Sequence, residues 1–447
     1  MVAELAAVFA AAALVALIGA RLLSRHYGAL TSSLGRPATL ALAWLLGLAL
    51  LAPLALALGL LGIPLRPWSL VPLALGAAGV AWLIARRSSG EAAVPQFTAP
   101  EQPALLWAAR AVLAAAILLA LLRVAVMPLW SWDHHAIWGV KARRLAAEGG
   151  VSLTFLNTPE FKDARPDYPL GFPTAALVHA WGRPPSPLAF KAFHLLASLA
   201  LLALLAAALR VSGAGRAAAL VLTAWVAAMP LFWDTEAVGQ AEMPLALVSV
   251  AALTLLLLTR TQPALAPLAG LALGFLPWIK HEGWPLAVAL GAWGLWSAAG
   301  GARRTLLQHL AAGALPLVAL ERLVAFLFLP PGVGFFSGDP LARLGERLPQ
   351  AGSILAAMLR HLAAPEALGL WLLLPFVLVA LALRRDHLAL GLALVVGFQL
   401  ALYMVISFGV YLPPLDHIRA SFPRITAALA PLAVVLVGRA SPGRMEP

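Results

Sequence analysis

The chain has 447 residues, of which 62% are hydrophobic and 11% are charged. Soluble domains carry roughly 25% charged residues, so the composition excludes an ordinary soluble protein and indicates a polytopic membrane protein. The net charge of +12 does not indicate nucleic-acid binding, because the basic residues are scattered between apolar runs. The chain has no cysteine, which excludes disulfides and thiolate metal sites.

Apolar runs of membrane-spanning length recur along the chain and predict an all-α bundle of about thirteen transmembrane helices. Four of them precede a polar segment that begins near residue 130, at about 4–23, 39–63, 69–86 and 104–128. Nine follow it, at about 188–209, 217–232, 243–259, 264–279, 285–300, 305–329, 366–383, 388–411 and 422–438.

Basic residues of the short loops fall on one side of this bundle if the spans alternate. They are Arg21, Arg25, Arg36, Arg86, Arg87, Arg210, Arg216, Arg260, Arg303, Arg304, Arg384, Arg385, Arg439 and Arg444. The positive-inside rule makes that side cytoplasmic, which places the N-terminus outside and residues 441–447 in a cytoplasmic tail. An Ala-, Leu- and Arg-rich composition is typical of GC-rich bacterial genomes, so we expect a multi-pass protein of the bacterial inner membrane.

Two long segments on the opposite, outer side are not predicted to span the membrane, at 130–187 and 330–365. The first contains KARRLAAEGG, which predicts a short interfacial helix that ends at Gly149-Gly150. Loops of this length in a compact protein are usually functional or mobile. We therefore expect the site of function on the outer side.

Asp133 is the first candidate for a functional residue. It lies in the segment WSWDHHAIWGVKARR, directly after the fourth predicted span. A carboxylate at a membrane boundary is costly to desolvate, so it usually has a partner or a task. The alternative is that Asp133 caps the interfacial helix that follows it.

Other polar groups fall on the same outer side. The proline-flanked segment at Tyr168 predicts either a stiff turn or a wall that returns the loop towards Asp133. Glu242 is either a favourable first-turn acid or, with the nearby Asp234 and Glu236, a ligand for a divalent cation.

Lys280 and Glu282 join two spans, either as a mutual ion pair, as ordinary loop charges or with the lysine as a phosphate ligand. Arg424 is predicted in the first turn of the last span, where an electropositive helix end attracts anions. The alternative for Arg424 is snorkelling to lipid headgroups. Together these residues predict a site for a substrate with an anionic headgroup and a lipid tail.

Five short elements of the sequence resemble those of the GT-C superfamily of polytopic glycosyltransferases, near the protein O-mannosyltransferase and aminoarabinose transferase branch. Asp133 and KARRLAAEGG match an acid that lies before an amphipathic helix, and Asp167-Tyr168-Pro169-Leu170 is similar to an (H/Y)-P-P-L element that starts a juxtamembrane helix. The other three elements are G-x-A-D-x-P-L-A at 239–246, with Glu242 in place of the aspartate, K-x-E-G at 280–283, and H-x-x-x-S-x-x-R at 417–424. The resemblance covers residues 104–440 and leaves the spans of residues 1–103 as an addition.

The resemblance implies transfer of a sugar from a polyprenyl-phosphate donor to a lipid, glycan or protein acceptor, with inversion at the anomeric carbon. Asp133 would be the general base. Lys280 and Arg424 would stabilise the leaving phosphate. The remaining residues that the resemblance and the clustering assign to substrate binding are Arg419, Lys191, His134, His417, Tyr168, Glu242 and Glu282. The replacement at Glu242 weakens the case for a divalent metal.

Three other functions compete with this one. A transporter or flippase for lipid-linked sugars shares the apolar bundle and the anion site, but it would tend to carry charges along a path through the membrane. An O-antigen polymerase or ligase usually has a very long, arginine-rich late loop, and the segment 330–365 is short by that standard. A purely structural protein does not explain why the charges cluster on one side.

Overall fold

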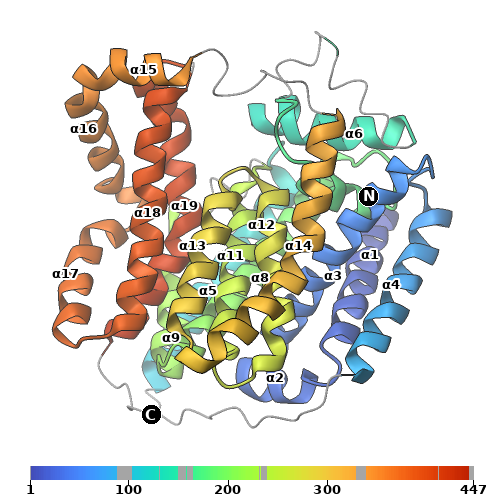
Figure 1. Ribbon diagram of the computed structural model, residues 1–447, viewed down its shortest axis with the longest axis horizontal. Coiled ribbons are helices and arrows are strands. Elements are labelled where there is room, and N and C mark those ends of the chain that lie inside the picture. The colour runs from blue at the N-terminus through green and yellow to red at the C-terminus, as the bar shows by residue number, and fades with distance from the viewer. Residues whose placement is uncertain are drawn as a thin grey trace.

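The computed structural model describes residues 2–87, 103–129, 131–149, 158, 165–230, 232, 239–328, 339–410 and 412–441. Every regular element among these residues is a helix (Figure 1). Seven of the described helices are long and apolar enough to cross a membrane. The protein is therefore an all-α polytopic membrane protein, as its composition predicts.

Each of the thirteen predicted apolar segments coincides with a helix over most of its described residues. The seven long ones are α1 (Val2–Leu22), α3 (Arg36–Leu60), α5 (Pro103–Val126), α8 (Pro187–Val211), α14 (Arg303–Phe328), α18 (His387–Gly409) and α19 (Pro414–Ala440). The other six are α4 (Pro67–Arg87), α9 (Arg216–Ala228), α11 (Glu242–Leu258), α12 (Ala266–Ile279), α13 (Gly283–Ser297) and α17 (Leu370–Leu383). Whether these six also cross the membrane stays a prediction.

Shorter helices fill the segments between the spans. They are α2 (Tyr27–Leu34), the π-helical turn η1 (Asp133–Trp138), α6 (Gly139–Ala147), α7 (Gly171–His179), α15 (Pro340–Arg347) and α16 (Ala351–Leu362). The predicted interfacial helix is α6, and Gly149 follows it with a φ of +68°. The predicted second outer segment contains α15 and α16, which pack on α18 and α19. Helices α6 and α15 lie at the same end of the molecule (Figure 1).

The last helix begins at Pro414, so the predicted start near residue 422 is wrong. The sequence Ser421-Phe422-Pro423 indicates a helix start because proline favours the first turn. Instead Pro414 takes that position and Pro423 lies inside the helix. Arg424 is therefore about three turns into α19. The argument that Arg424 adds to an electropositive helix end does not hold.

Helix α11 lies at the centre of the bundle and is buried along its entire length. It packs against α8, α12, α13 and α19. Most of its side chains are Leu or Ala, which pack closely against the neighbouring apolar helices, so that every residue of α11 is buried. Its first residue, Glu242, is consequently buried inside the protein.

A buried ion pair between Arg439 and Asp386 joins three turns of the chain. The predicted alternation of the spans places all three turns on the arginine-rich side. Arg439 Nη2 donates to Asp386 Oδ1 at 2.8 Å, and Arg439 Nη1 donates to the carbonyl oxygen of Ser212 at 2.9 Å. Arg439 and Arg424 lie about 22 Å apart along α19, at 1.5 Å per residue. Residues predicted on opposite sides thus lie towards opposite ends of the same helix. Which end faces the cytoplasm stays a prediction.

Candidate functional site

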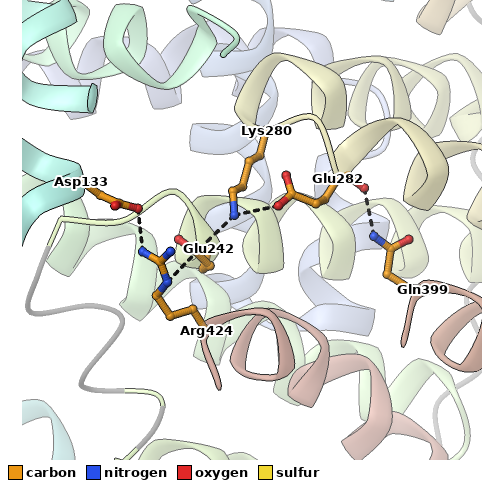
Figure 2. A network of polar contacts seen from close by, with 6 residues as sticks. All are labelled: Asp133, Glu242, Lys280, Glu282, Gln399 and Arg424. Atoms are coloured by element: carbon orange, nitrogen blue, oxygen red, sulfur yellow. Dashed lines mark hydrogen bonds and ion pairs between the residues drawn. The ribbon is translucent and has the colours of Figure 1, made fainter. Parts of the chain in front are cut away.

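Asp133 opens the π-helical turn η1 and its carboxylate faces α19 (Figure 2). The N-cap position is taken by Trp132, and no side chain caps the turn. Asp133 therefore does not act as the helix cap that one interpretation of the sequence predicts. Its Oδ2 instead accepts a hydrogen bond from Arg424 Nη1 at 2.6 Å.

Arg424 also faces Glu242, at the start of the central helix. Arg424 Nε lies 3.7 Å from Glu242 Oε1. The Glu242 side chain is only 2% exposed, so its charge needs partners inside the protein. The guanidinium thus lies between two carboxylates that are more than a hundred residues apart in the sequence.

Lys280 is the second cation at Glu242. Its Nζ lies 3.0 Å from Glu242 Oε1 and 2.9 Å from Glu282 Oε1. Burial alone would lower the pKa of Lys280, but the adjacent Glu242 and Glu282 carboxylates outweigh it and hold that pKa above its usual range. Lys280 is therefore a charged ammonium at neutral pH.

The turn between α12 and α13 positions Lys280 and Glu282. Helix α12 ends at Ile279, and Lys280 follows in an extended conformation. Gly283 then starts α13 so close to α12 that a Cβ at this position would lie 2.1 Å from the carbonyl oxygen of Leu276. Gln399 of α18 holds the turn from the other side, where its Nε2 donates to the carbonyl oxygen of Glu282 at 3.2 Å.

Asp133, Arg424, Glu242, Lys280 and Glu282 thus form a continuous ion-pair network of alternating charge (Figure 2). The network has three carboxylates and two cations, which leaves one net negative charge. Buried ion pairs contribute little net stability compared with apolar packing, because desolvation offsets their attraction. Ionisable groups among apolar helices are usually functional, which makes this network the candidate site.

Tyr168 brings the first outer loop back to η1, as the wall interpretation predicts. Its ring stacks on Trp138 with centroids 5.4 Å apart and an angle of 26° between the planes. Lys141 of α6 fixes the backbone there, since its Nζ donates to the carbonyl oxygens of Arg165 at 2.6 Å and Tyr168 at 2.9 Å. Complete burial lowers the pKa of Lys141 to about 7. The sequence indicates a cation near Asp133 but not this buried, structural role.

Asp167 and His281 connect the same loop to the α12–α13 turn. His281 Nε2 lies 3.8 Å from Asp167 Oδ2, and the His281 ring packs edge-on against Tyr168. Burial raises the pKa of the Asp167 carboxyl, which the charges of His281 and Lys141 partly oppose. The end of this loop at Asp167 and Tyr168 is thereby connected to the turn that carries Lys280 and Glu282.

His134 is next to Asp133 in the sequence, but its ring packs against other aromatic rings. It is fully buried, and its ring packs on Phe190 with centroids 4.7 Å apart. Burial lowers its pKa to about 4, assisted by Arg143 and His135, so the imidazole is neutral. Neither ring nitrogen has a hydrogen-bond partner in the part of the chain that the structure describes.

Two other predicted residues, Arg419 and Lys191, lie outside the network, and His417 lies close to it. Arg419 is 72% exposed and lies 3.7 Å from Asp416, so it is not part of the network. Lys191 Nζ donates to the carbonyl oxygen of Met127 at 3.0 Å, just past the end of α5. His417 is buried on α19 and is close enough to interact electrostatically with Lys280, Glu282 and Arg424.

The described residues contain no group of three or more His, Asp or Glu side chains arranged to hold a metal ion. Asp234 and Glu236, which the sequence suggests as cation ligands with Glu242, lie outside the described residues. Comparisons with protein-family models, curated proteins and solved structures found no match to this chain.

Proposed function

We propose that the protein is a membrane glycosyltransferase that moves a sugar from a polyprenyl-phosphate donor to an acceptor hydroxyl at the outer membrane face. The observation that carries the proposal is the ion-pair network, in which the partly exposed carboxylate of Asp133 is paired with Arg424, and a second cation, Lys280, lies on the other side of Glu242. The Asp133 side chain is 17% exposed and Arg424 is 21% exposed, whereas Glu242 is 2% exposed. Glu282 is 15% exposed, but it pairs with Lys280, which is only 6% exposed. Asp133 and Arg424 are therefore the ion pair of the network in which both partners are accessible to a substrate.

The roles follow from the charges. The acceptor hydroxyl oxygen attacks the anomeric carbon as the bond from that carbon to the phosphate oxygen breaks, and the configuration inverts. The hydroxyl proton passes to the Asp133 carboxylate. The bonding electrons stay with the leaving polyprenyl phosphate, whose growing charge Arg424 and Lys280 stabilise. Glu242 and Glu282 hold these two cations in place.

The proposal agrees with the resemblance of residues 104–440 to the GT-C superfamily, and with a bacterial inner-membrane location whose site faces the periplasm. The acceptor belongs to the lipids, glycans or proteins of the cell envelope. No step in this scheme needs a group beyond the donor, the acceptor and the residues of the network.

The test is turnover of a panel of polyprenyl-phosphate sugars by the purified protein in lipid, with crude acceptor extract and with or without divalent cations. We expect the wild-type protein to release polyprenyl phosphate from one donor. Asp133→Asn should lower that rate by a factor of about 10² to 10⁴, because the base is lost. Asp416→Asn, which removes an exposed acid from the start of α19, should leave it unchanged.

Two results would contradict the proposal. Turnover by Asp133→Asn at the wild-type rate would remove Asp133 from the mechanism. Absence of release from every donor, together with movement of a labelled lipid-linked sugar across the bilayer, would instead support a flippase that uses the same anion site.

A further inference from the structure

We propose that the donor phosphate displaces Asp133 from Arg424, so that the base becomes available only after the donor has bound. This inference rests on the proposed function and adds an order of events to it. It starts from the observation that the groups assigned as base and as phosphate ligand are hydrogen-bonded to each other, at 2.6 Å.

A lipid phosphate cannot simply be added to the network. Arg424 already faces Asp133 and Glu242, and Lys280 already faces Glu242 and Glu282. The five side chains carry one net negative charge, and the phosphate brings at least one more. A like charge so close costs several kcal/mol in a partly buried site, so the phosphate has to take the place of a carboxylate.

Asp133 is the carboxylate that can leave. Glu242 is fixed at the tip of the fully buried helix α11 and contacts both cations. Glu282 pairs with Lys280, so its departure would not free the guanidinium that lies beside the base. Asp133 is more exposed than Glu242, lies on a short π-helical turn and contacts one cation of the network. Rotation of its side chain frees Arg424 without moving a core helix.

The exchange has a direct chemical consequence. While Arg424 donates to Oδ2 of Asp133, this hydrogen bond holds the carboxylate towards α19 and occupies one of its lone pairs, so the carboxylate is not oriented towards an acceptor hydroxyl. A phosphate oxygen that takes over the Arg424 hydrogen bond releases Asp133 Oδ2 towards the incoming hydroxyl. Donor binding therefore precedes productive acceptor binding, and the same guanidinium first restrains the base and then stabilises the leaving group.

The experiment measures binding of farnesyl phosphate, whose headgroup is the proposed leaving group, to the purified full-length protein in lipid nanodiscs. Asp133→Asn should bind it about tenfold more tightly than wild type, because a competing carboxylate is gone. Asp133→Glu, which keeps that carboxylate, should stay close to wild type. Asp416→Asn removes an equal charge from an exposed position on α19 and should not change the affinity.

A double-mutant cycle with Arg424→Gln then separates exchange from general charge repulsion. If Asp133 competes for Arg424, the tenfold gain disappears in the Arg424→Gln background. A gain of equal size in both backgrounds, or no gain from Asp133→Asn in wild type, would overturn the exchange. If Arg424→Gln does not fold, the exchange can still be tested, because the absence of a gain from Asp133→Asn alone is enough to overturn it.

The two proposals can fail separately. Sugar transfer without coupling between Asp133 and Arg424 would leave the transferase standing and remove the exchange. Coupled phosphate binding without transfer from any donor would keep the exchange as an anion switch and remove the transferase. Replacing farnesyl phosphate with inorganic phosphate shows whether the headgroup alone drives the exchange or the lipid tail is required.

Discussion

At the scale of single residues, Lys141 is as unusual as the network itself. It is a completely buried amine that donates to the backbone carbonyl oxygens of Arg165 and Tyr168, and the charge of Asp167 acts on it. The two backbone carbonyls accept from two of its three N–H donors but do not neutralise its charge. This explains why the pKa falls to about 7 and why the loop stays close to α6.

This pKa predicts a pH dependence of stability. A lysine in the unfolded chain titrates near 10.4, so between about pH 7 and pH 10 the unfolded state binds more protons than the folded state. The free energy of unfolding should therefore rise with pH across that window, by an amount on the order of a few kcal/mol. Thermal unfolding of wild type and Lys141→Met over pH 6 to 10 checks this, and the variant should lack the rise. An equal rise in both proteins would show that another group causes it.

The angular positions of side chains around α19 explain why Arg424 belongs to the network and Arg419 does not. Arg419 precedes Arg424 by five residues, which is about 140° around the helix, and it points to the surface. His417 precedes Arg424 by seven residues, about 20° away, and is buried on the same face. The sequence places all three on the outer side, but it does not fix how α19 is rotated.

At the scale of elements, the turn between α12 and α13 controls the geometry of Lys280 and Glu282. Gly283→Ala should shift this turn, because the added Cβ meets backbone atoms of Leu276 and Pro277 that cannot move independently. We expect a loss of about 1–3 kcal/mol in stability, and a larger loss of turnover than of farnesyl phosphate binding.

Gly291→Ala is the matched control in the same helix. Its Cβ would meet only a methyl group of Leu273, at an ordinary 3.7 Å, so stability should be unchanged or slightly higher. Unfolding temperatures of the two variants in the same detergent make the comparison. Equal temperatures would show that the close approach at Gly283 does not restrain the turn.

The elements were more predictable from the sequence than their contacts. The thirteen apolar segments form helices over most of their length because long runs of Leu and Ala favour a helix over other secondary structures. The chemistry of Asp133, Glu242, Lys280, Glu282 and Arg424 singled them out, since charges are rare here and lie between the runs. Their pairing was not predictable, because it depends on how separate helices pack. The predicted start of α19 was wrong because the local sequence at Pro423 is typical of the first turn of a helix.

At the scale of the whole molecule, the buried Asp386–Arg439 pair joins helices that the network does not. Arg439 contacts Asp386, which also caps α18 by accepting from Ala389 N, and it contacts the end of α8 through Ser212. Replacing Arg439 by Met leaves the Asp386 carboxylate buried without its bidentate partner. We expect a loss of about 3–5 kcal/mol in the free energy of unfolding.

Arg439→Met with Asp386→Asn should recover much of that loss, because the uncompensated charge is gone. Denaturant or thermal unfolding of the single and double variants measures this difference. A single variant as stable as wild type would mean that this pair does not hold the helices together. Farnesyl phosphate binding by the folded double variant should stay close to wild type, since the network lies at the other end of α19.

Helix α19 is consequently held by two arginines that lie about 22 Å apart along its axis. Arg424 connects it to α11 and η1, and Arg439 connects it to α18 and α8. A helix held at two points along its axis by buried ion pairs resists sliding along that axis. If the donor exchanges with Asp133, Arg424 keeps Glu242 as a partner and Arg439 keeps Asp386, so α19 stays in place while the base moves. Cysteine-attached spin labels on α19 and α8 should therefore report the same distance with and without the donor, on a chain that carries no native cysteine to remove.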